Sequence, residues 1–531
     1  MAKISYRLWM LFDIQQNAPE INEAEVARQL SLPPDGPGSL YKNEKGDYLV
    51  YIRLAEITPE TLASLAATGV KIEDIAEAYR TITAWLKLDQ LPALAALSTV
   101  ENVEEELRPF TSQIPSSFSA SEETPTDCNS IISEGDSHLR ADEARAAFNL
   151  DGTGVTIGIL SDSFDQDTNA VTHASDDILS GDLPGPGNPC GHLTAVEVIT
   201  TGLHGGHDEG RGMLQLVHDL APGATLKFAS GNGIYEFGTN IENLRAAGAD
   251  ILADDVAYAN EPWFQAGPNG VAISNVVGSG AFYFTAAGNS NLLLPNGNEA
   301  GSYEAPAYRP IACPANLPAV ETSCHNFYPG PGSVDDPSDT ITLISGGSFV
   351  AALQWAQPWY GITTDLDFFL LDANGNVVAS AVHTNAGVNG SQKPFELIFY
   401  TNNTGSTQTY DLVVARANVG DALSPRIKFI FLVSNGGITD VEYHVSNLGD
   451  IIGPTIFGHS GAEDAFSVAA MAYDQYGNVE HYSSRGPVTY YFAPATDTNP
   501  ALPLAIPHVI NKPDFTATDG GRTTFFGSNY G

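Results

Sequence analysis

Residues 209–229 read EGRGMLQLVHDLAPGATLKFA, and this stretch decides the fold. Residues 209–220 predict a helix whose apolar side chains recur at helical spacing: Met213, Leu214, Leu216, Val217 and Leu220. The turn Ala-Pro-Gly-Ala at 221–224 ends this helix, and an apolar run of strand length follows at 224–229. A helix that returns directly to a buried strand is typical of a parallel sheet covered by helices.

The surrounding sequence repeats this alternation of strands and helices. Apolar runs at 155–160, 251–253 and 281–285 predict further buried strands, and residues 241–247 predict a helix that ends at Gly248. We therefore expect an α/β unit built on a parallel sheet, with helices on both faces.

Two other segments have a different pattern of predicted strands and helices. Residues 47–109 predict the order strand, helix, strand, strand, helix, strand, which is the ferredoxin-like α+β pattern. At about 328–445 many short apolar runs alternate with Gly, Asn and Asp turns, which predicts a β-sandwich inserted into the α/β unit. Residues 110–145 are rich in Ser, Thr, Pro and acidic residues, so we expect a linker and a processing site there.

Composition narrows the class of function. The 531 residues carry a formal net charge of −40, which disfavours binding to nucleic acid or to anionic membranes. No apolar run reaches the roughly 18 residues of a membrane span. We expect a secreted protein that is monomeric and needs neither a cofactor nor a metal.

Four cysteines are present, and their spacing is far from that of a metal site. We favour a local disulfide between Cys313 and Cys324, which leaves Cys128 to pair with Cys190. Reduced structural cysteines are the alternative.

Polar residues recur where the predicted strands end. Asp162 follows the strand at 155–160, and Ala286-Ala287-Gly288-Asn289 follows the strand at 281–285. Ligands bind at the carboxyl ends of strands in open α/β sheets. Further along, Ser483-Ser484-Arg485-Gly486-Pro487 precedes Lys512-Pro513-Asp514.

In this order, these stretches resemble the subtilisin-like serine peptidases and lean towards their sedolisin relatives. The resemblance covers about 145–320 and 450–531. It implies that Asp162 is the acid of the catalytic triad and that Asn289 is the oxyanion-hole amide. It also implies that Asp255, Val256 and Ala257 bind substrate backbone.

The resemblance also names the parts of the chain. It implies an N-terminal prodomain at 1–109, a linker at 110–145 and a catalytic domain at 146–325 that resumes at 449–531, around a β-sandwich at 326–448. The prodomain would act as an intramolecular partner, and the substrate would be a polypeptide.

The general base is open between two residues. Subtilisins carry a His, followed by Gly, at the start of the helix that precedes the Ala-Pro-Gly-Ala turn. The segment His204-Gly205-Gly206-His207 resembles that motif. Counted back from Pro222, however, the helix starts at Glu209, and sedolisin-type enzymes have a Glu there. We favour Glu209, paired with Asp162, over His204. Met213 stands where those enzymes place a second acid, and we expect His218 to be a packing or surface residue.

The nucleophile is missing from the sequence. The family carries it in a Gly-Thr-Ser segment that begins a helix, and no such segment occurs before Gly531. Ser528 lacks that context, so we expect the serine in sequence beyond Gly531 and an inactive chain without it. Two hypotheses follow: a serine endopeptidase zymogen that works through an acyl-enzyme, or a non-catalytic binding or adhesion protein that uses the β-sandwich.

Overall fold

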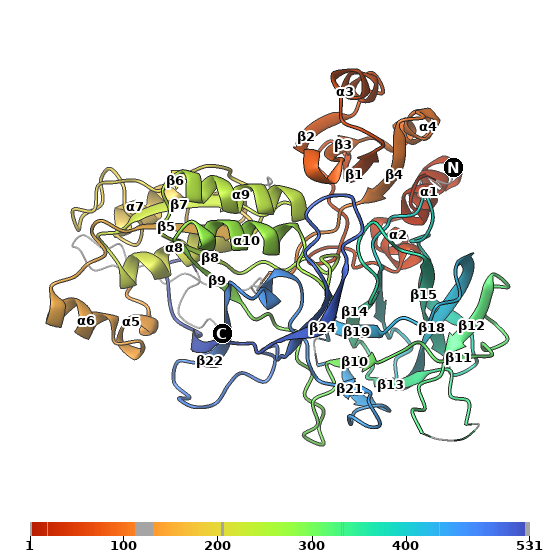
Figure 1. Cartoon of the computed structure of the whole chain (residues 1–531). Helices are drawn as coiled ribbons and strands as arrows, with labels where there is room; N and C mark the ends of the chain where they lie inside the picture. The colour runs from red at the N-terminus through yellow and green to blue at the C-terminus, as the bar shows by residue number, and fades with distance from the viewer. Residues whose placement is uncertain are drawn as a thin grey trace.

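A seven-stranded parallel sheet forms the centre of the α/β unit (Figure 1), in a computed structural model that describes residues 3–18, 20–111, 131–202, 206–330, 332, 334–434 and 436–525. The strand order is β25-β22-β9-β8-β5-β7-β6, and every neighbouring pair is parallel. The strands are β5 (Thr156–Ser161), β6 (Glu197–Val198), β7 (Thr225–Ser230), β8 (Ile251–Asp254), β9 (Phe282–Ala286), β22 (Phe466–Ala472) and β25 (Phe515–Asp519). The predicted parallel sheet is therefore confirmed.

Helices cover the two faces of this sheet unequally. On one face, α8 (Glu209–Leu220) packs its Leu214 against the β5 side chains Ile157 and Ile159. Since side chains alternate along a strand, Leu160 points to the other face, where α9 (Ile234–Ala246) and α10 (Pro268–Gly278) pack. Helix α8 has the bounds expected from the sequence. The short helices α5 (Glu134–His138), α6 (Ala141–Phe148) and α7 (Ala174–Ser180) complete the described helices of this unit.

Part of the α8 face of the sheet carries apolar side chains that are incompletely covered. Phe282 is 57% exposed and Phe515 is 52% exposed. Between them lie the partly exposed rings of Phe284 and Phe466, and the ring of Phe466 lies 5.2 Å from that of Phe284 and 5.4 Å from that of Phe515. Small side chains, Ala286, Ala470 and Ala517, continue this face towards the carboxyl ends of the strands.

The N-terminal unit is a four-stranded antiparallel sheet, in the order β2-β3-β1-β4, with helices. Its elements are α1 (Tyr6–Asn17), α2 (Glu23–Leu30), β1 (Tyr48–Leu54), α3 (Pro59–Ala66), β2 (Lys71–Ala76), β3 (Thr81–Leu86), α4 (Leu91–Ala96) and β4 (Val100–Glu105). The element order expected for residues 47–109 is present. Helices α1 and α2 add to it at the N-terminal side.

The inserted region forms two antiparallel sheets that enclose one large apolar core. The first sheet has the order β17-β14-β19-β10-β21, and the second contains β11-β12-β18-β13-β20 with β15 and β16. Its strands are β10 (Ser302–Ala305), β11 (Pro310–Ile311), β12 (Glu321–His325), β13 (Asp339–Leu343), β14 (Ser348–Trp355), β15 (Thr364–Asp372), β16 (Val377–Ala381), β17 (Phe395–Thr401), β18 (Gln408–Gly420), β19 (Ile427–Val433), β20 (Ile438–Val441) and β21 (Ile451–Ile452).

The insertion thus begins near residue 302 rather than at the expected 326. Strands β10 and β11 are too short for an alternation of apolar and polar residues to be recognised in the sequence. Strand β10 pairs with β19, more than a hundred residues later in the chain, and β11 pairs with β12. The disulfide expected between Cys313 and Cys324 is confirmed, with Cα atoms 4.9 Å apart. Cys128 lies outside the described residues, and so does its expected bond with Cys190.

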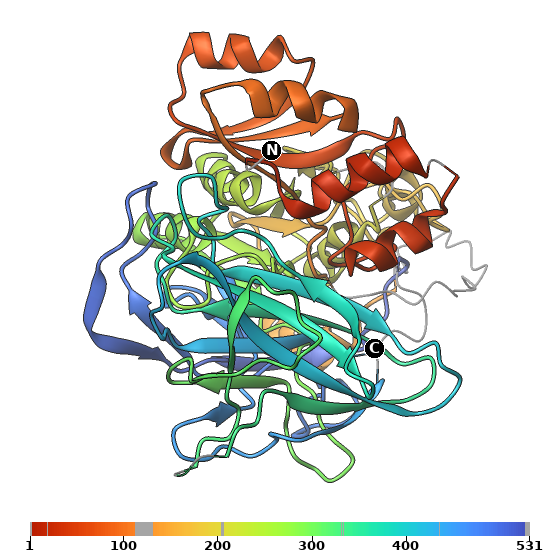
Figure 2. The ribbon, with the colours of Figure 1, turned by 90° about the vertical axis from the view of Figure 1, so that its right-hand side faces the viewer.

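The N-terminal unit packs on both other units at once (Figure 2). Its apolar core is continuous with the outer side chains Val350 and Leu432 of the sandwich and with Trp263 of the α/β unit. A buried polar chain reinforces this contact: His383 of the sandwich lies 3.1 Å from a carboxylate oxygen of Glu105 and 2.9 Å from one of Glu396. A hairpin of β23 (Val488–Phe492) and β24 (Pro503–Ile510) packs its Tyr491 and Phe492 side chains against this shared apolar cluster.

Lys393 lies where the three units meet. Its ammonium group pairs with Glu104 of the N-terminal unit. It also lies 4.8 Å from the ring centre of Tyr51, 5.6 Å from that of Tyr235 and 5.3 Å from that of Trp359, rings that come from the three different units. Cation–π contacts of a desolvated ammonium are worth about 2 kcal/mol each at most.

Replacing Lys393 by Met should therefore loosen the junction, because the partly buried carboxylate of Glu104 loses its partner and three rings lose their cation. We expect the free energy of unfolding to fall by about 3 kcal/mol and amides of β1 and β4 to exchange faster with deuterium. Lys42→Met is the matched control, since Lys42 and Glu23 form an exposed pair. Equal exchange rates in both variants would contradict this role.

Candidate functional site

The start of α8 is fixed by a carboxylate from the end of β5. Asp162 Oδ2 accepts the backbone N–H of His207 at 2.5 Å, and Asp162 Oδ1 accepts that of Glu209 at 3.1 Å. The first N–H groups of a helix have no partner within the helix, and an acidic side chain is stabilising at this end. Asp162 thus holds the residue that opens the helix, and Glu209 is that residue, as predicted.

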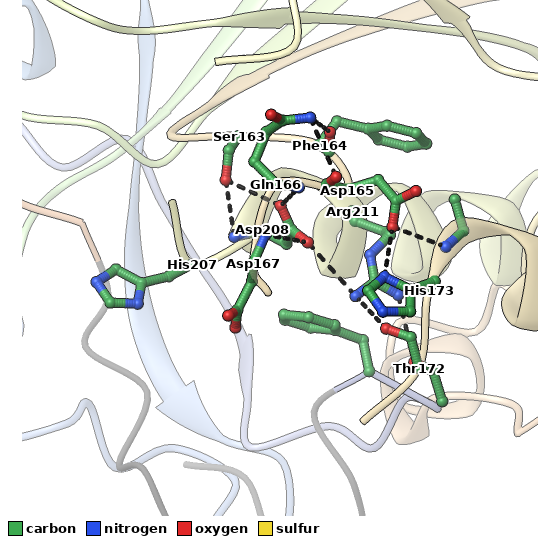
Figure 3. A network of polar contacts seen from close by, with 12 residues as sticks. Ser163, Phe164, Asp165, Gln166, Asp167, Thr172, His173, His207, Asp208 and Arg211 are labelled. Carbon is green, nitrogen blue, oxygen red and sulfur yellow. Dashed lines mark hydrogen bonds and ion pairs between the residues drawn. The ribbon is translucent and has the colours of Figure 1, made fainter. Parts of the chain in front are cut away.

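A second buried carboxylate, Asp208, locks the neighbouring loop to the same helix end (Figure 3). Ser163 Oγ donates to Asp208 Oδ1 at 3.0 Å, and the backbone N–H of Gln166 donates to the same oxygen at 2.7 Å. Arg211, which is fully buried, lies 3.6 Å from Asp208 Oδ2 and 2.5 Å from Asp177. Asp208 is not among the residues predicted from the sequence, although its place beside the predicted helix start is a usable signal.

Space at this point admits only glycine. A Cβ on Gly210 would lie 2.2 Å from a ring carbon of Phe228 and 2.9 Å from the carbonyl oxygen of Ser163. The Glu-Gly pair at 209–210 therefore lets the helix start close against the end of β5.

The side chain of Glu209 does not hydrogen-bond to Asp162, which differs from the pairing expected from the sequence. It is buried, and among the described residues its Oε2 atom has no hydrogen-bond partner. Burial raises the pKa of Glu209 well above its usual range, and the nearby charges of Asp255 and Asp162 raise it further. Burial likewise raises the pKa of Asp162, and hydrogen bonds from the backbone of His207 oppose this effect.

Asp255 lies in the same cluster rather than only along a substrate-binding edge. It follows β8, and in the sheet Asp254 stands opposite Leu160 of β5. Burial, together with the charges of Asp162 and Asp254, raises the pKa of Asp255 to about 7.

The other predicted substrate-binding residues have separate roles. Val256 is buried, and its side chain belongs to the core between the sheet and α9. Ala257 offers its backbone to another segment: its N–H donates to the Phe110 carbonyl oxygen at 2.8 Å, and its carbonyl accepts the Phe110 N–H at 2.8 Å. Residues 108–111 of the N-terminal unit therefore already lie along this edge as an extended chain.

Asn289 lies at the end of β9 and lines a cavity of about 800 Å³ that Asp255, Phe110 and Thr111 also line. Its side chain is exposed. Two hydrogen bonds fix the loop before and after it: the Ser484 N–H donates to the Gly288 carbonyl at 2.8 Å, and the Ser290 N–H donates to Ser484 Oγ at 2.9 Å. The Ser483-Ser484 stretch found in the sequence thus positions this amide.

The histidines have different surroundings. His204, the alternative base, lies outside the described residues, as does Ser528. The side chain of His207 is exposed and points away from Asp208 (Figure 3). His218 is buried, its ring centre lies 5.0 Å from that of His192, and burial lowers its pKa to about 4, so it is a packing residue.

No protein-family model and no curated protein matches this chain. Among solved structures it is similar to the CspB protease of Clostridium perfringens, with 10% identity and a TM-score of 0.39 over 75% of this chain and 82% of that one. It is also similar to fervidolysin of Fervidobacterium pennivorans, described as a keratinolytic enzyme related to subtilisin (10% identity, TM-score 0.25, 78% and 81% of the two chains). A third neighbour is the epidermin leader peptide processing serine protease of Staphylococcus aureus (10%, 0.24, 46% and 60%).

These structural neighbours are proteases, some of them related to subtilisin. Their TM-scores all lie below 0.5. None of the helices that the structure describes is long and apolar enough to cross a membrane.

Several buried carboxyl groups bind their protons more tightly in the folded state than in the unfolded chain. Burial raises the pKa of Glu106 to about 8, although the ammonium of Lys393 opposes the shift, and burial also raises that of Glu236 to about 7. Below the ordinary pKa of about 4.3, such a group does not lower the free energy of unfolding. As the pH rises through the pKa of the group in the folded state, the free energy of unfolding falls.

The melting temperature should therefore fall as the pH is raised from 5 to 9. Glu106→Gln should flatten the pH dependence of the unfolding free energy by up to one proton, or about 1.4 kcal/mol per pH unit, between pH 5 and 8. Thermal unfolding followed by circular dichroism checks this. The control is Glu60→Gln, because Glu60 is exposed; a melting temperature that rises from pH 5 to 8 would refute the expectation.

Proposed function

We propose that the protein is a serine-type endopeptidase, secreted as a zymogen, that hydrolyses peptide bonds through an acyl-enzyme. One observation carries the proposal: an acid and an amide border a cavity that already receives an extended stretch of peptide. Asp255 and Asn289 line this cavity together with Phe110 and with Met213, which lies one turn after Glu209 on α8.

The peptide edge supports a polypeptide as the substrate. Paired N–H and C=O groups of Ala257 hold Phe110 as an antiparallel partner, and this recognition reads backbone rather than a particular side chain. A substrate that adds a strand at the same place would carry its next peptide carbonyl towards Asn289.

Each polar group then has a chemical task. Glu209 is the general base that accepts the serine proton, Asp162 holds the helix end that presents it, and the Asn289 amide stabilises the oxyanion. An amide donor in this role is worth about 2.7–4 kcal/mol of transition-state stabilisation. A carboxylate base with a raised pKa favours activity at acidic rather than alkaline pH.

The nucleophile would be a serine in sequence beyond Gly531, at the start of a helix. The partly uncovered face of the sheet supports this: its apolar side chains from Phe282 to Phe515 lie beside α8, and the small residues Ala286, Ala470 and Ala517 would admit a closely packed helix. The start of such a helix, which would carry the serine, would lie next to the cavity that Asn289 lines.

A fluorophosphonate probe tests this chemistry. A chain extended by the sequence encoded after Gly531 should be labelled on one serine, fastest at acidic pH within a scan from pH 3 to 9. Asn289→Ala should slow labelling and peptide hydrolysis by about 10²–10³-fold, because the oxyanion loses its donor. Glu209→Gln should abolish hydrolysis while the fold is retained.

Two results would contradict the assignment. A rate plateau at pH 8–9 that disappears in His204→Ala, with Glu209→Gln unaffected, would make His204 the base. A stop codon directly after Gly531, with no labelled serine, would favour a non-catalytic binding protein instead.

The N-terminal unit would act as the intramolecular inhibitor, with residues 108–111 blocking the edge that substrates need. Ala257→Pro removes the N–H that donates to Phe110, so the Phe110 amide should exchange with deuterium at least tenfold faster. Ala257→Ser keeps that N–H and serves as the control. Equal protection of the Phe110 amide in the two variants would show that this segment is held by other contacts.

A further inference from the structure

The first sheet of the sandwich is apolar on its outer face as well as on the face that lines its own core. Along β14, Phe349 and Ala351 pack inside the sandwich, whereas Val350 points to the opposite face. Strands that are apolar on both faces need a cover on each of them. The N-terminal unit supplies the outer cover (Figure 2). The outer face that it buries consists of Val350, Ala352, Leu397, Ile430 and Leu432.

A buried arginine of the N-terminal unit binds a loop of the sandwich beside this face. Arg53 Nη1 donates to the carbonyl oxygen of Ser391 at 2.6 Å, and Nη2 donates to that of Gly390 at 2.7 Å. Close by, Asn102 Nδ2 donates to the Asn389 carbonyl oxygen at 3.1 Å. Because Arg53 is only 6% exposed, its two bonds are shielded from water, and charged donors make the stronger hydrogen bonds. The loop at 389–391 is therefore held by the N-terminal unit.

Ser31, which follows α2, completes the edge of the same sheet. Its carbonyl oxygen accepts the N–H of Phe399 at 2.8 Å, and its hydroxyl oxygen accepts the N–H of Ser380 at 3.0 Å. Strand β17, which contains Phe399, is the outermost strand of its sheet. An edge strand has backbone groups that need a partner from outside the sheet. The N-terminal unit provides one, so it covers the sheet at its edge as well as on its outer face.

The segment that blocks the substrate edge is a small part of this contact. Residues 108–111 meet the α/β unit through the two hydrogen bonds between Phe110 and Ala257. These bonds do not involve the outer face of the sandwich. The end of this segment can therefore separate from Ala257 while the rest of the N-terminal unit stays in place.

We propose that the N-terminal unit is a permanent subunit of the protein, bound to the outer face of the sandwich even after the linker is cut. Access to the substrate edge would then come from movement of the end of residues 108–111, without departure of the whole unit. The contact resembles a divided apolar core, which is typical of complexes that stay together. The proposal does not require the peptidase activity, because it concerns only how two units of the chain bind each other.

A cut chain tests this directly. A recognition sequence for a site-specific protease is inserted into the linker of the full chain, and the purified protein is cut completely. Gel filtration then follows the two fragments from about 10 μM down to about 10 nM. We expect them to elute together throughout, because separation would expose the apolar outer face. Fragments that separate at micromolar concentration would overturn the proposal.

Two substitutions should weaken the complex after the cut. Val350→Glu places an acid on the covered face, so the fragments should separate at micromolar concentration. Arg53→Met removes the donors of two buried carbonyl groups and should weaken the affinity by about tenfold or more. Val377→Glu and Lys71→Met are the matched controls, because both change exposed side chains. Equal affinities in Val350→Glu and Val377→Glu would contradict the role of the outer face.

Hydrogen exchange on the wild type gives a measurement that does not depend on the folding of any variant. The amides of Phe399 and Ser380, which donate to Ser31, should exchange at the same rate before and after the cut. The Phe110 amide should exchange faster after the cut, because a free chain end frays. Faster exchange at Phe399 and Ser380 as well would show that the whole unit has left. Unchanged exchange at Phe110 would refute the local opening.

The subunit and the peptidase can fail separately. Fragments that stay together, in an extended chain that never reacts with a fluorophosphonate, refute the peptidase and leave the subunit standing. A labelled serine in an extended chain whose fragments separate refutes the subunit and leaves the peptidase standing.

Discussion

The carboxylate of Asp162 accepting two backbone N–H groups at the start of α8 is the contact on which the candidate site depends. It joins the end of β5 to the helix that packs on that face of the sheet. Because the helix start is fixed, Glu209 is directed inward, next to the strand ends that carry Asp255 and Asn289. Asp162 thus stabilises the helix end, and the side chain of Glu209 stays available for the proposed role of base.

Acidic side chains that lie close together repel each other, in a protein that already has a net charge of −40. The fold reduces this repulsion in two ways. Some acids are neutralised by buried cations, as Asp254 and Glu261 are by His459, 3.2 and 2.8 Å away. Although burial opposes it, these carboxylates raise the pKa of His459 to about 10. Others, such as Glu106, hold protons instead, because burial raises the pKa of the carboxyl more than the ammonium of Lys393 lowers it. Because these groups bind protons more tightly in the folded state, an acidic medium favours the folded protein.

Strong periodicity made much of the α/β unit predictable. The bounds of α8 and the strands around it follow from long apolar patterns, and the position of Glu209 at the helix start follows from its distance to Pro222. Short strands such as β10 carry too few residues for a pattern. The direction of the Asp255 side chain depends on the register of β5 against β8, and no local sequence feature encodes that register. His204 and Ser528 lie outside the described residues, so their predicted roles stay predictions.

The insertion of the sandwich between two adjacent strands also governs how the chain can assemble. Strand β22 pairs with β9, and Phe466 lies opposite Phe284, although the whole sandwich separates these two strands in the sequence. Closing so long a loop as a disordered coil carries an entropy cost that grows with its length. A sandwich that has already folded brings its two ends together and shortens the effective loop. We therefore expect the sandwich to fold first. The pairing of β22 with β9, which joins the N-terminal and C-terminal segments of the α/β unit, would follow and complete the sheet.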